Sequence, residues 1–143
     1  MKLREIQYGS DEYVQEKALR EAVLRTPLGL VLTEDDIKDD PYSTHFGAFN
    51  ASNELIACIL LHPIDINTAQ LRQMAVQSSI QKQGLGRSLV EYFEKQAMLH
   101  HYRVIQLNAR ITAQGFYEKL GYTPVDQPFT HMTLPHIKMQ KIL

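Results

Sequence analysis

The sequence has no tryptophan and a single cysteine, Cys58, among its 143 residues. One cysteine excludes an internal disulfide, which is typical of proteins from a reducing compartment. Cys58 lies in the apolar run 55–61, which favours a buried side chain over a nucleophile. No apolar run approaches the roughly 20 residues of a membrane-spanning helix, and Met1–Arg4 is followed by polar residues rather than by an apolar signal segment. We therefore expect a cytoplasmic protein with no membrane partner.

The chain also has little net charge. Its 15 Lys and Arg residues and 16 Asp and Glu residues give a formal charge of -1 at pH 7. This balance gives no reason to expect a nucleic acid or an anionic membrane surface as a partner. The sequence contains no repeat, low-complexity tract or linker, so residues 1–143 are expected to form one domain with one core.

A phosphate-binding loop is predicted between the apolar run 71–76 and the amphipathic segment 88–98. Glycines let a backbone approach a ligand closely, and the free N–H groups in the first turn of a helix attract an anion. Lys82 and Arg87 add positive charge at the rim. The full loop is Gln81-Lys82-Gln83-Gly84-Leu85-Gly86-Arg87-Ser88. This pattern predicts a phosphorylated ligand.

Three known patterns of phosphate-binding loop can be compared with this segment. A Walker loop has four residues between its glycines and ends in Gly-Lys-Ser/Thr, which this segment does not. A dinucleotide fingerprint has a third glycine at the position of Leu89. The pattern Gln/Arg-x-x-Gly-x-Gly/Ala fits, although the six residues alone fit a plain strand-to-helix turn as well.

A second motif follows about thirty residues later. It reads Ala113-Gln114-Gly115-Phe116-Tyr117-Glu118-Lys119-Leu120-Gly121-Tyr122. Its apolar residues recur at i, i+3, i+4 and i+7, on one face of a helix, and Gly121 lies where a left-handed residue ends a helix. In order and spacing the two motifs resemble the signatures of the GNAT N-acetyltransferase superfamily. The segment 134–139 also resembles the endings of its small single-domain bacterial members.

The resemblance implies a mixed α/β fold, with a twisted, mostly antiparallel central sheet that contains a splayed parallel strand pair and is flanked by helices. The pattern of the chain agrees with this order. Strands are expected at 3–7, 45–49, 55–61, 71–76, 104–107, 122–125 and 136–141, and helices at 11–24, 88–98 and 113–120. We expect Val14, Ala18 and Ala22, with Leu19 and Val23, to form the buried stripe of the first helix.

Acetyl-CoA is the co-substrate that the resemblance implies, with no metal. In the family the pantetheine arm lies between two splayed strands, here 71–76 and 103–108, and pairs with the main chain. The implied contacts are Met74, Ala75 and Val76 for the arm, residues 81–88 for the pyrophosphate, and Asn108, Ala113, Phe116 and Tyr117. Asn108 would alternatively order the turn that follows it.

Tyr117 matches the family tyrosine that donates a proton to the leaving thiolate; otherwise it is a core aromatic residue. The attacking amine must lose a proton, because an amine such as lysine has a pKa of about 10.4. Lysine-modifying relatives carry a glutamate where this chain has Gln70, and an amide cannot accept that proton. The remaining candidate bases, each acting through water, are Glu54, Asp65, His45, His62 and His136. For the histidines we favour the alternative of a strand or loop residue with no chemical role, and His136 is the best candidate among them.

We therefore expect an acetyl-CoA-dependent N-acetyltransferase that acts on an amine of a small molecule or peptide. Two alternatives stay open: a non-catalytic acyl-CoA-binding or regulatory domain, and an acyltransferase that uses another acyl-CoA or a hydroxyl acceptor. Many relatives form dimers, so a homodimer is one expected state. The acidic segment 35–40 either attracts a cationic acceptor or, as we favour, is a solvated surface.

Overall fold

One seven-stranded sheet runs through the computed structural model, which describes residues 1–143. The strands are β1 (Lys2–Ile6), β2 (Thr44–Phe49), β3 (Leu55–Pro63), β4 (Thr68–Val76), β5 (Val104–Arg110), β6 (Thr123–His131) and β7 (Leu134–Ile142). Their order is β1-β2-β3-β4-β5-β7-β6, and only β4 and β5 run parallel. The predicted mixed α/β fold is confirmed.

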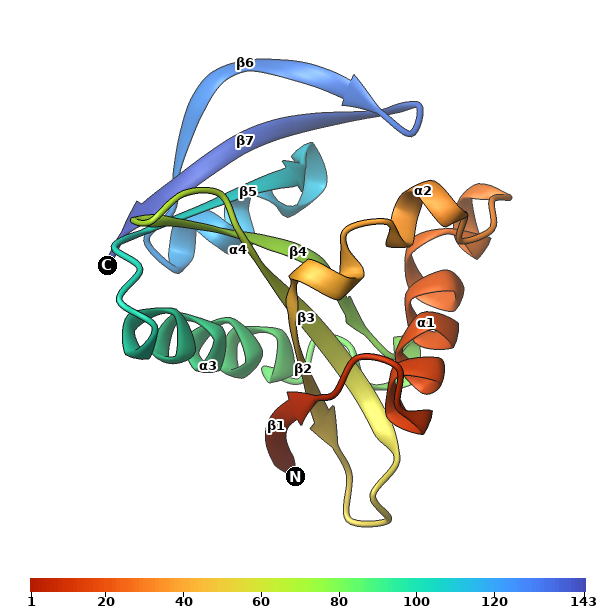
Figure 1. The fold of residues 1–143 in the computed structure, drawn as a ribbon. Helices are drawn as coiled ribbons and strands as arrows, with labels where there is room; N and C mark the ends of the chain where they lie inside the picture. Colours follow the sequence, from red (N-terminus) through yellow and green to blue (C-terminus); the bar gives the residue numbers. More distant parts are fainter.

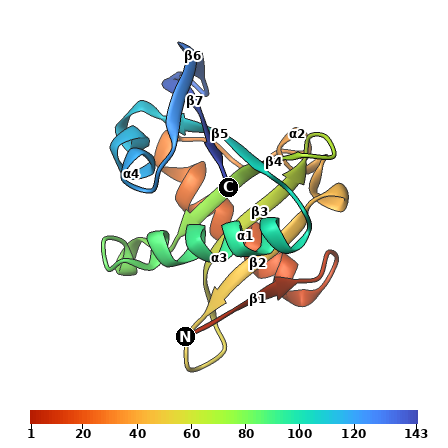
Figure 2. The ribbon, with the colours of Figure 1, turned by 90° about the vertical axis from the view of Figure 1, so that its left-hand side faces the viewer.

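Helices cover both faces of the sheet. They are α1 (Asp11–Leu24), α2 (Glu34–Ile37), α3 (Leu85–Leu99) and α4 (Gln114–Lys119), with single 3₁₀ turns at Thr26–Leu28, Asp40–Tyr42, Ser78–Ile80 and Ile111–Ala113. α1 lies on one face and α3 on the other, and the β6–β7 hairpin extends towards α2 (Figure 1 and Figure 2). None of the helices combines the length and the apolarity needed to cross a membrane.

The sheet has one apolar and one polar face in its C-terminal half, because side chains alternate along each strand. Ile105, Leu107 and Ala109 of β5 belong to the main buried cluster, together with residues of α3 and α4. Asn108 and Arg110 therefore point to the other face, the face on which α1 lies. This polar face forms the floor of the cavity described below.

The parallel strands β4 and β5 separate along their length. They pair only from Thr68 with Val104 to Gln70 with Gln106. Beyond that point β5 continues to pair with β7, while β4 stays with β3 and contains a register shift. Gln73, at this irregularity, has a positive φ of 51°. The expected splayed pair is thus confirmed, and it opens just after Gln70.

The predicted hairpin across residues 50–53 is also present, between β2 and β3. The side-chain Oδ1 of Asn50 accepts hydrogen bonds from the N–H groups of Ser52 and Glu54, at 3.0 and 2.9 Å. Asn50 therefore closes the turn as its side-chain chemistry predicts. Residues 57–61 of β3 are buried throughout, as expected for a central strand covered on both faces.

The expected buried stripe of α1 is wrong. Val14 is 60% exposed, and Ala18 and Ala22 are also exposed, whereas the buried residues of the helix are Tyr13, Glu16 and Arg20. The helix turns its polar stripe towards the sheet. The hydrophobic periodicity alone favoured the opposite orientation.

Partners on other segments make this orientation stable. The Nη1 of Arg20 donates to Glu16 at 2.9 Å and to Asp40 at 2.8 Å, and the hydroxyl of Tyr13 donates to Asp40 at 2.6 Å. His45 of β2 donates through Nδ1 to Glu16 and through Nε2 to the carbonyl of Asp40. Buried charges are tolerated when they are paired and hydrogen-bonded in this way.

Several boundaries differ from those expected from sequence. α3 begins at Leu85 rather than at Ser88, and Ala113 belongs to a 3₁₀ turn before α4. β6 extends to His131, well beyond the predicted 122–125. This edge strand is exposed along most of its length and interrupted near Asp126 (φ 63°), so it has no apolar alternation to reveal it.

Candidate active site

The N-terminus of α3 has the properties of an anion site. Gly84 precedes the helix with φ of 84°, no side chain caps the first turn, and that turn contains no acidic residue. The N–H of Ser88 already binds the carbonyl of Gly84 at 3.2 Å. The earlier N–H groups, from Leu85 to Arg87, have no partner within the helix. They are available to a phosphate, as the loop pattern predicts.

The loop is attached to the end of β4. The Nε2 of Gln81 donates to the carbonyl of Val76 at 2.9 Å. Nothing lies within 4 Å of the position that a Cβ on Gly84 would take, so its positive φ rather than crowding requires glycine there. A Cβ on Gly86 would lie 3.4 Å from the ring of Phe116. Phe116 thus links the two sequence motifs in space.

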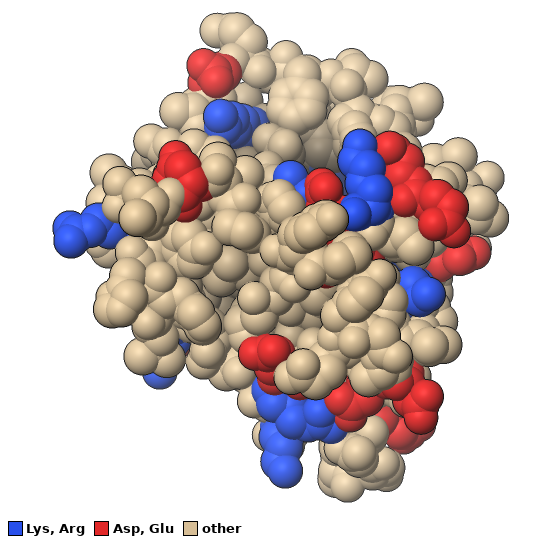
Figure 3. Space-filling model, in the orientation of Figure 1, with Lys and Arg blue, Asp and Glu red and all other residues tan.

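A cavity of about 760 Å³ opens where β4 and β5 separate, on the polar face of the sheet. In Figure 3 acidic and basic side chains gather beside a hollow on this side of the molecule. The cavity wall draws on α1, the segment around α2, strands β4 and β5, α4 and the β6–β7 hairpin. Five predicted site residues line it: Met74, Gln81, Asn108, Ala113 and Tyr117.

The other predicted cofactor residues lie outside this cavity. A second cavity of about 270 Å³ at the start of α3 is lined by Gln83, Gly84, Leu85 and Ser88, among others. Six predicted residues line neither cavity: Ala75, Val76, Lys82, Gly86, Arg87 and Phe116. The guanidinium of Arg87 pairs with Glu91 at 2.8 Å on the exposed face of α3.

Tyr117 is the one phenol that lines the larger cavity. It is 7% exposed, and its ring packs edge-on against Phe116 and Tyr122, with centroids 5.0 and 5.7 Å away. Its hydroxyl has no hydrogen-bond partner within the chain, whereas that of Tyr122 donates to Glu94 at 2.8 Å. Burial raises the pKa of Tyr117 to about 12, so its proton is present at neutral pH.

The structure separates the five candidate bases. Glu54 accepts a hydrogen bond from Asn50 in the β2–β3 turn, and Asp65 accepts from backbone N–H groups in the β3–β4 turn. Both nitrogens of His45 are used within the buried α1 network. His62 is bound to Ser43 at 3.0 Å. None of these four lines the cavity.

His136 does line the cavity and is 7% exposed. Its Nδ1 lies 2.9 Å from the carbonyl of Leu134. A carbonyl only accepts, so Nδ1 carries the hydrogen, and the lone pair of the neutral ring is on Nε2. Phe129 stacks on the ring with centroids 5.8 Å apart and fixes its orientation. His136 is thus prepared to accept a proton through Nε2.

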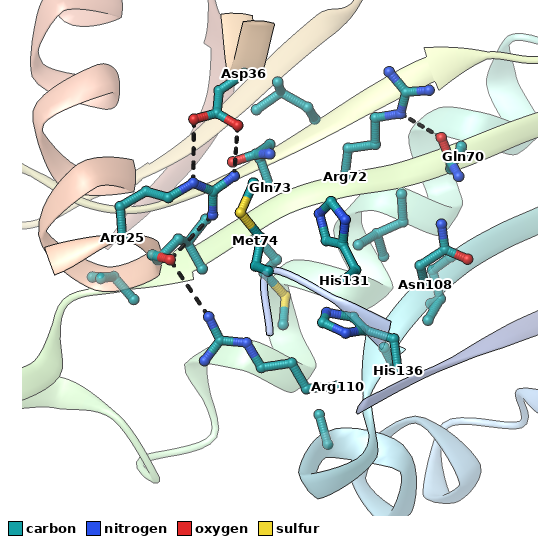
Figure 4. A pocket seen from close by; sticks show the side chains of 18 of the residues that line it. Arg25, Asp36, Gln70, Arg72, Gln73, Met74, Asn108, Arg110, His131 and His136 are labelled. Carbon is teal, nitrogen blue, oxygen red and sulfur yellow. Dashed lines mark hydrogen bonds and ion pairs between the residues drawn. The ribbon is translucent and has the colours of Figure 1, made fainter. Parts of the chain in front are cut away.

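A second histidine, which sequence reasoning did not single out as a base, lies against His136. The ring of His131 meets that of His136 edge-on at a centroid distance of 5.3 Å, and in Figure 4 both rings appear between Met74 and Asn108. Burial, followed by the charges of His136 and Arg25, lowers the pKa of His131. His131 is therefore neutral at neutral pH.

The acidic segment 35–40 is the solvated surface that we expected only at Asp35 and, in part, at Asp39, whose side chain is 41% exposed. The side chain of Asp35 is 82% exposed, but those of Asp36 and Asp40 are only 7% and 4% exposed. Each aspartate has a cationic partner within 3.0 Å: Asp35 with Lys38, Asp36 with Arg25, Asp39 with Arg72, and Asp40 with Arg20. Each carboxylate of this segment that lines the cavity therefore already has a cationic partner.

Two further polar groups at the cavity lack full partners. Arg110 reaches the carbonyl of Leu24 through Nη2 at 3.5 Å, and it has no carboxylate partner. The Oε1 of Gln73 has no hydrogen-bond partner and is closed off from solvent, so it becomes available to a bound molecule only when the side chain turns. Gln70, at the position where the resemblance implies a glutamate in lysine-modifying relatives, accepts a hydrogen bond from the Nε of Arg72 (Figure 4).

Sequence reasoning missed much of this cavity wall: Arg25, Arg72, Gln73, Arg110, Phe129 and His131. These residues come from segments up to about a hundred positions apart and form no local pattern. The positive φ of Gln73 also has no signature in the sequence. The fold alone brings them together.

Comparison with known proteins assigns the fold to a family. A family model described as "Acetyltransferase (GNAT) domain" matches residues 11–143 of this chain. A candidate acetyltransferase of Bacillus subtilis (strain 168) is 32% identical over 75 residues, which cover 52% of this chain and 51% of that protein. The match thus spans about half the length of this curated relative.

Solved structures share the fold over nearly the whole chain. The crystal structure of Escherichia coli ElaA has a TM-score of 0.86 at 19% identity and is covered over 98% of both chains. An aminoglycoside 6′-N-acetyltransferase complexed with coenzyme A has a TM-score of 0.81 at 21% identity, with 99% of this chain and 97% of the other covered. At such identities the likeness establishes the fold.

Proposed function

Because this chain belongs to the GNAT acetyltransferase family, we propose that it transfers the acetyl group of acetyl-CoA directly to the nitrogen of an amine. The observation that carries this proposal is the opening between β4 and β5. The segment that leads to the uncapped start of α3 follows the end of β4, and Tyr117, with its unpaired hydroxyl, lines the cavity at this opening. A thioester with a distant pyrophosphate matches such a site, and coenzyme A is bound in the aminoglycoside enzyme of this fold.

The residues of the chain divide the work of binding. The N–H groups from Leu85 to Arg87 bind the pyrophosphate, assisted by the positive end of the α3 dipole. The backbone of Met74, Ala75 and Val76, which has no partner strand on the β5 side, pairs with the pantetheine arm. Gln81 holds the loop to the end of β4 through Val76 and so positions these two parts relative to each other.

Two side chains move the protons. The amine nitrogen forms a bond to the carbonyl carbon, the carbon–sulfur bond breaks, and the thiolate receives the proton of Tyr117. The proton that the amine loses passes to Nε2 of His136, directly or through one water molecule. The raised pKa of Tyr117 keeps the donor protonated, and the Leu134 carbonyl keeps Nε2 of His136 free to accept.

The alternatives make different demands on the site. A non-catalytic acyl-CoA-binding domain would need neither an unpaired phenol nor an oriented imidazole in the cavity. A hydroxyl acceptor would also need a base to remove its proton. The presence of His136 alone therefore does not favour an amine acceptor over a hydroxyl acceptor. Tyr117 and His136 both line the same cavity, which supports acetyl transfer over binding of the coenzyme alone.

Release of free thiol from acetyl-CoA, measured with a mixture of amines, tests this function. We expect release that depends on the amine, a drop of about 100-fold or more in His136→Ala, and partial recovery of that variant on addition of imidazole. His62→Ala, outside the cavity, is the control and should keep near-normal turnover. Binding of acetyl-CoA without thiol release for any amine would favour the non-catalytic alternative.

A further inference from the structure

The charges at the cavity point to the class of acceptor. The four aspartates that line it are each paired with a cation, whereas Arg110 has no carboxylate partner. Building on the transfer reaction above, we propose that the acceptor is an amine that also carries a free carboxylate, such as an amino acid. Arg110 binds the carboxylate, and His136 faces the amine.

Arg110 is placed to bind an anion. It is the last residue of β5 and half-buried, and the single contact of its guanidinium, 3.5 Å to the carbonyl of Leu24, is at the long limit for a hydrogen bond. A guanidinium has five N–H donors in a planar fork that fits a carboxylate through two parallel bonds. Arg25, which contacts the same carbonyl, is already bound to Asp36 in this manner (Figure 4).

The amine group of the acceptor also has partners on the polar face of the sheet that forms the cavity floor. Arg110 and His136 are direct cross-strand neighbours in the β5–β7 register, so their side chains leave the same face of the sheet. Such neighbours have Cβ atoms about 5 Å apart, which lets one small molecule contact both. The orphaned Oε1 of Gln73, when its side chain turns, offers a further acceptor for an amine N–H.

Other amine classes fit this distribution less well. A polyamine or an aminoglycoside carries several positive charges and no carboxylate, so it would leave Arg110 without an anionic partner and would share aspartates that already have cationic partners. The N-terminal amine of a long peptide has no free carboxylate close to it. The unmatched groups of the cavity, one cation and one oxygen, complement the two ends of an amino acid.

The test compares matched acceptors. Initial rates of thiol release from acetyl-CoA are measured with the twenty common L-amino acids, their amides, spermidine and an aminoglycoside. We expect at least one amino acid to exceed its own amide in kcat/KM by about 100-fold or more, the loss typical of removing one partner of a buried charge pair. In Arg110→Gln the rate ratio of the amino acid to its amide should fall to about one, with the acetyl-CoA affinity nearly unchanged.

Arg103→Gln is the matched control, because Arg103 is exposed and outside the cavity, and its loss should leave the preference intact. Equal or faster acetylation of amides, spermidine or the aminoglycoside would overturn the acceptor class and leave the transfer function standing. Weaker acetyl-CoA binding by Arg110→Gln would assign Arg110 to the coenzyme instead. Bound acetyl-CoA with no acetylation of any amine would remove the proposed function, and the inference with it.

Discussion

Among single residues, Tyr117 and His136 are prepared for opposite tasks. Burial raises the pKa of Tyr117 to about 12, which keeps the phenol protonated across the range in which enzymes normally work. The hydrogen bond from Nδ1 of His136 to a carbonyl of its own strand leaves Nε2 as an acceptor. Neither property is visible in the sequence, because the raised pKa of Tyr117 arises from packing and the free Nε2 of His136 arises from the geometry of its strand.

Tyr117→Phe should lower turnover by about 100-fold or more while leaving acetyl-CoA affinity nearly unchanged, because it removes a proton donor and no packing volume. Steady-state rates and calorimetric titration measure the two quantities. Tyr122→Phe is the control: that hydroxyl is bound to Glu94, so its loss should reduce stability by about 1–3 kcal/mol and leave turnover in place. Equal turnover of Tyr117→Phe and the wild type would remove the donor role.

Tyr117 and Asn108 could be placed at the cavity from the sequence because they belong to, or stand next to, a motif. His131, Gln73 and Arg110 could not. Their positions depend on contacts that only the fold creates. His131 packs against a second histidine, Gln73 lies at the irregularity of β4, and Arg110 contacts the end of α1. The same holds for Gln70, whose amide is bound by Arg72 and so is not free in the cavity.

Among the elements, the sequence was most informative where structure is local. The hairpin turn at Asn50, the glycine before α3 and the glycine after α4 are all as predicted, because turn chemistry and positive φ depend on a few neighbouring residues. The orientation of α1 was predicted wrongly. Its buried stripe is polar and is stabilised by Asp40 and His45, which lie 20 or more residues from Arg20.

The loop before α3 yields a prediction with a closely matched control. Gly84→Ala and Gly9→Ala both place a side chain at positive φ, 84° and 80°, in open space, so both should lose about 1–2 kcal/mol of stability. Only Gly84→Ala should also weaken acetyl-CoA binding, by about tenfold, as the loop shifts to relieve strain. Titration calorimetry decides, and equal affinity in the two variants would contradict the loop assignment.

The buried network of α1 predicts a pH dependence of stability. Burial lowers the pKa of His45, but the hydrogen bond from the ring to Glu16 and the charge of Glu16 outweigh it, so the pKa is raised above its usual 6.5. A raised histidine pKa means that its stabilising effect is complete below about pH 6.5 and is lost as pH rises through the folded-state pKa. The free energy of unfolding should therefore fall between pH 6.5 and 8.

Denaturant unfolding across this range, with His45→Gln as the comparison, measures the effect. The pH dependence should largely disappear in the variant. Burial lowers the pKa values of His62 and His131, so those residues oppose folding only below about pH 6.5. The buried thiol of Cys58, with its raised pKa, contributes only near pH 8.5 and above. A flat stability between pH 6.5 and 8, or the same decline in His45→Gln, would contradict this account.

For the whole molecule, the sheet order determines what the site can bind. Seven strands and a single parallel pair create one opening. The cavity at this opening is lined both by polar residues of the sheet floor, such as Asn108 and Arg110, and by Tyr117 of the apolar cluster. Two short motifs could indicate this arrangement because the resemblance supplied the topology. Composition and charge supported only the expectation of one domain without a nucleic acid or membrane partner.

The measurement that most directly tests the central claim is calorimetric titration of the protein with acetyl-CoA, beside NAD and dephosphorylated adenine nucleotides. We predict saturable one-to-one binding of acetyl-CoA, weakened in Gly84→Ala and competed by free coenzyme A, with much weaker binding of the other nucleotides. No binding of acetyl-CoA, or equal binding of every nucleotide, would contradict the proposed site.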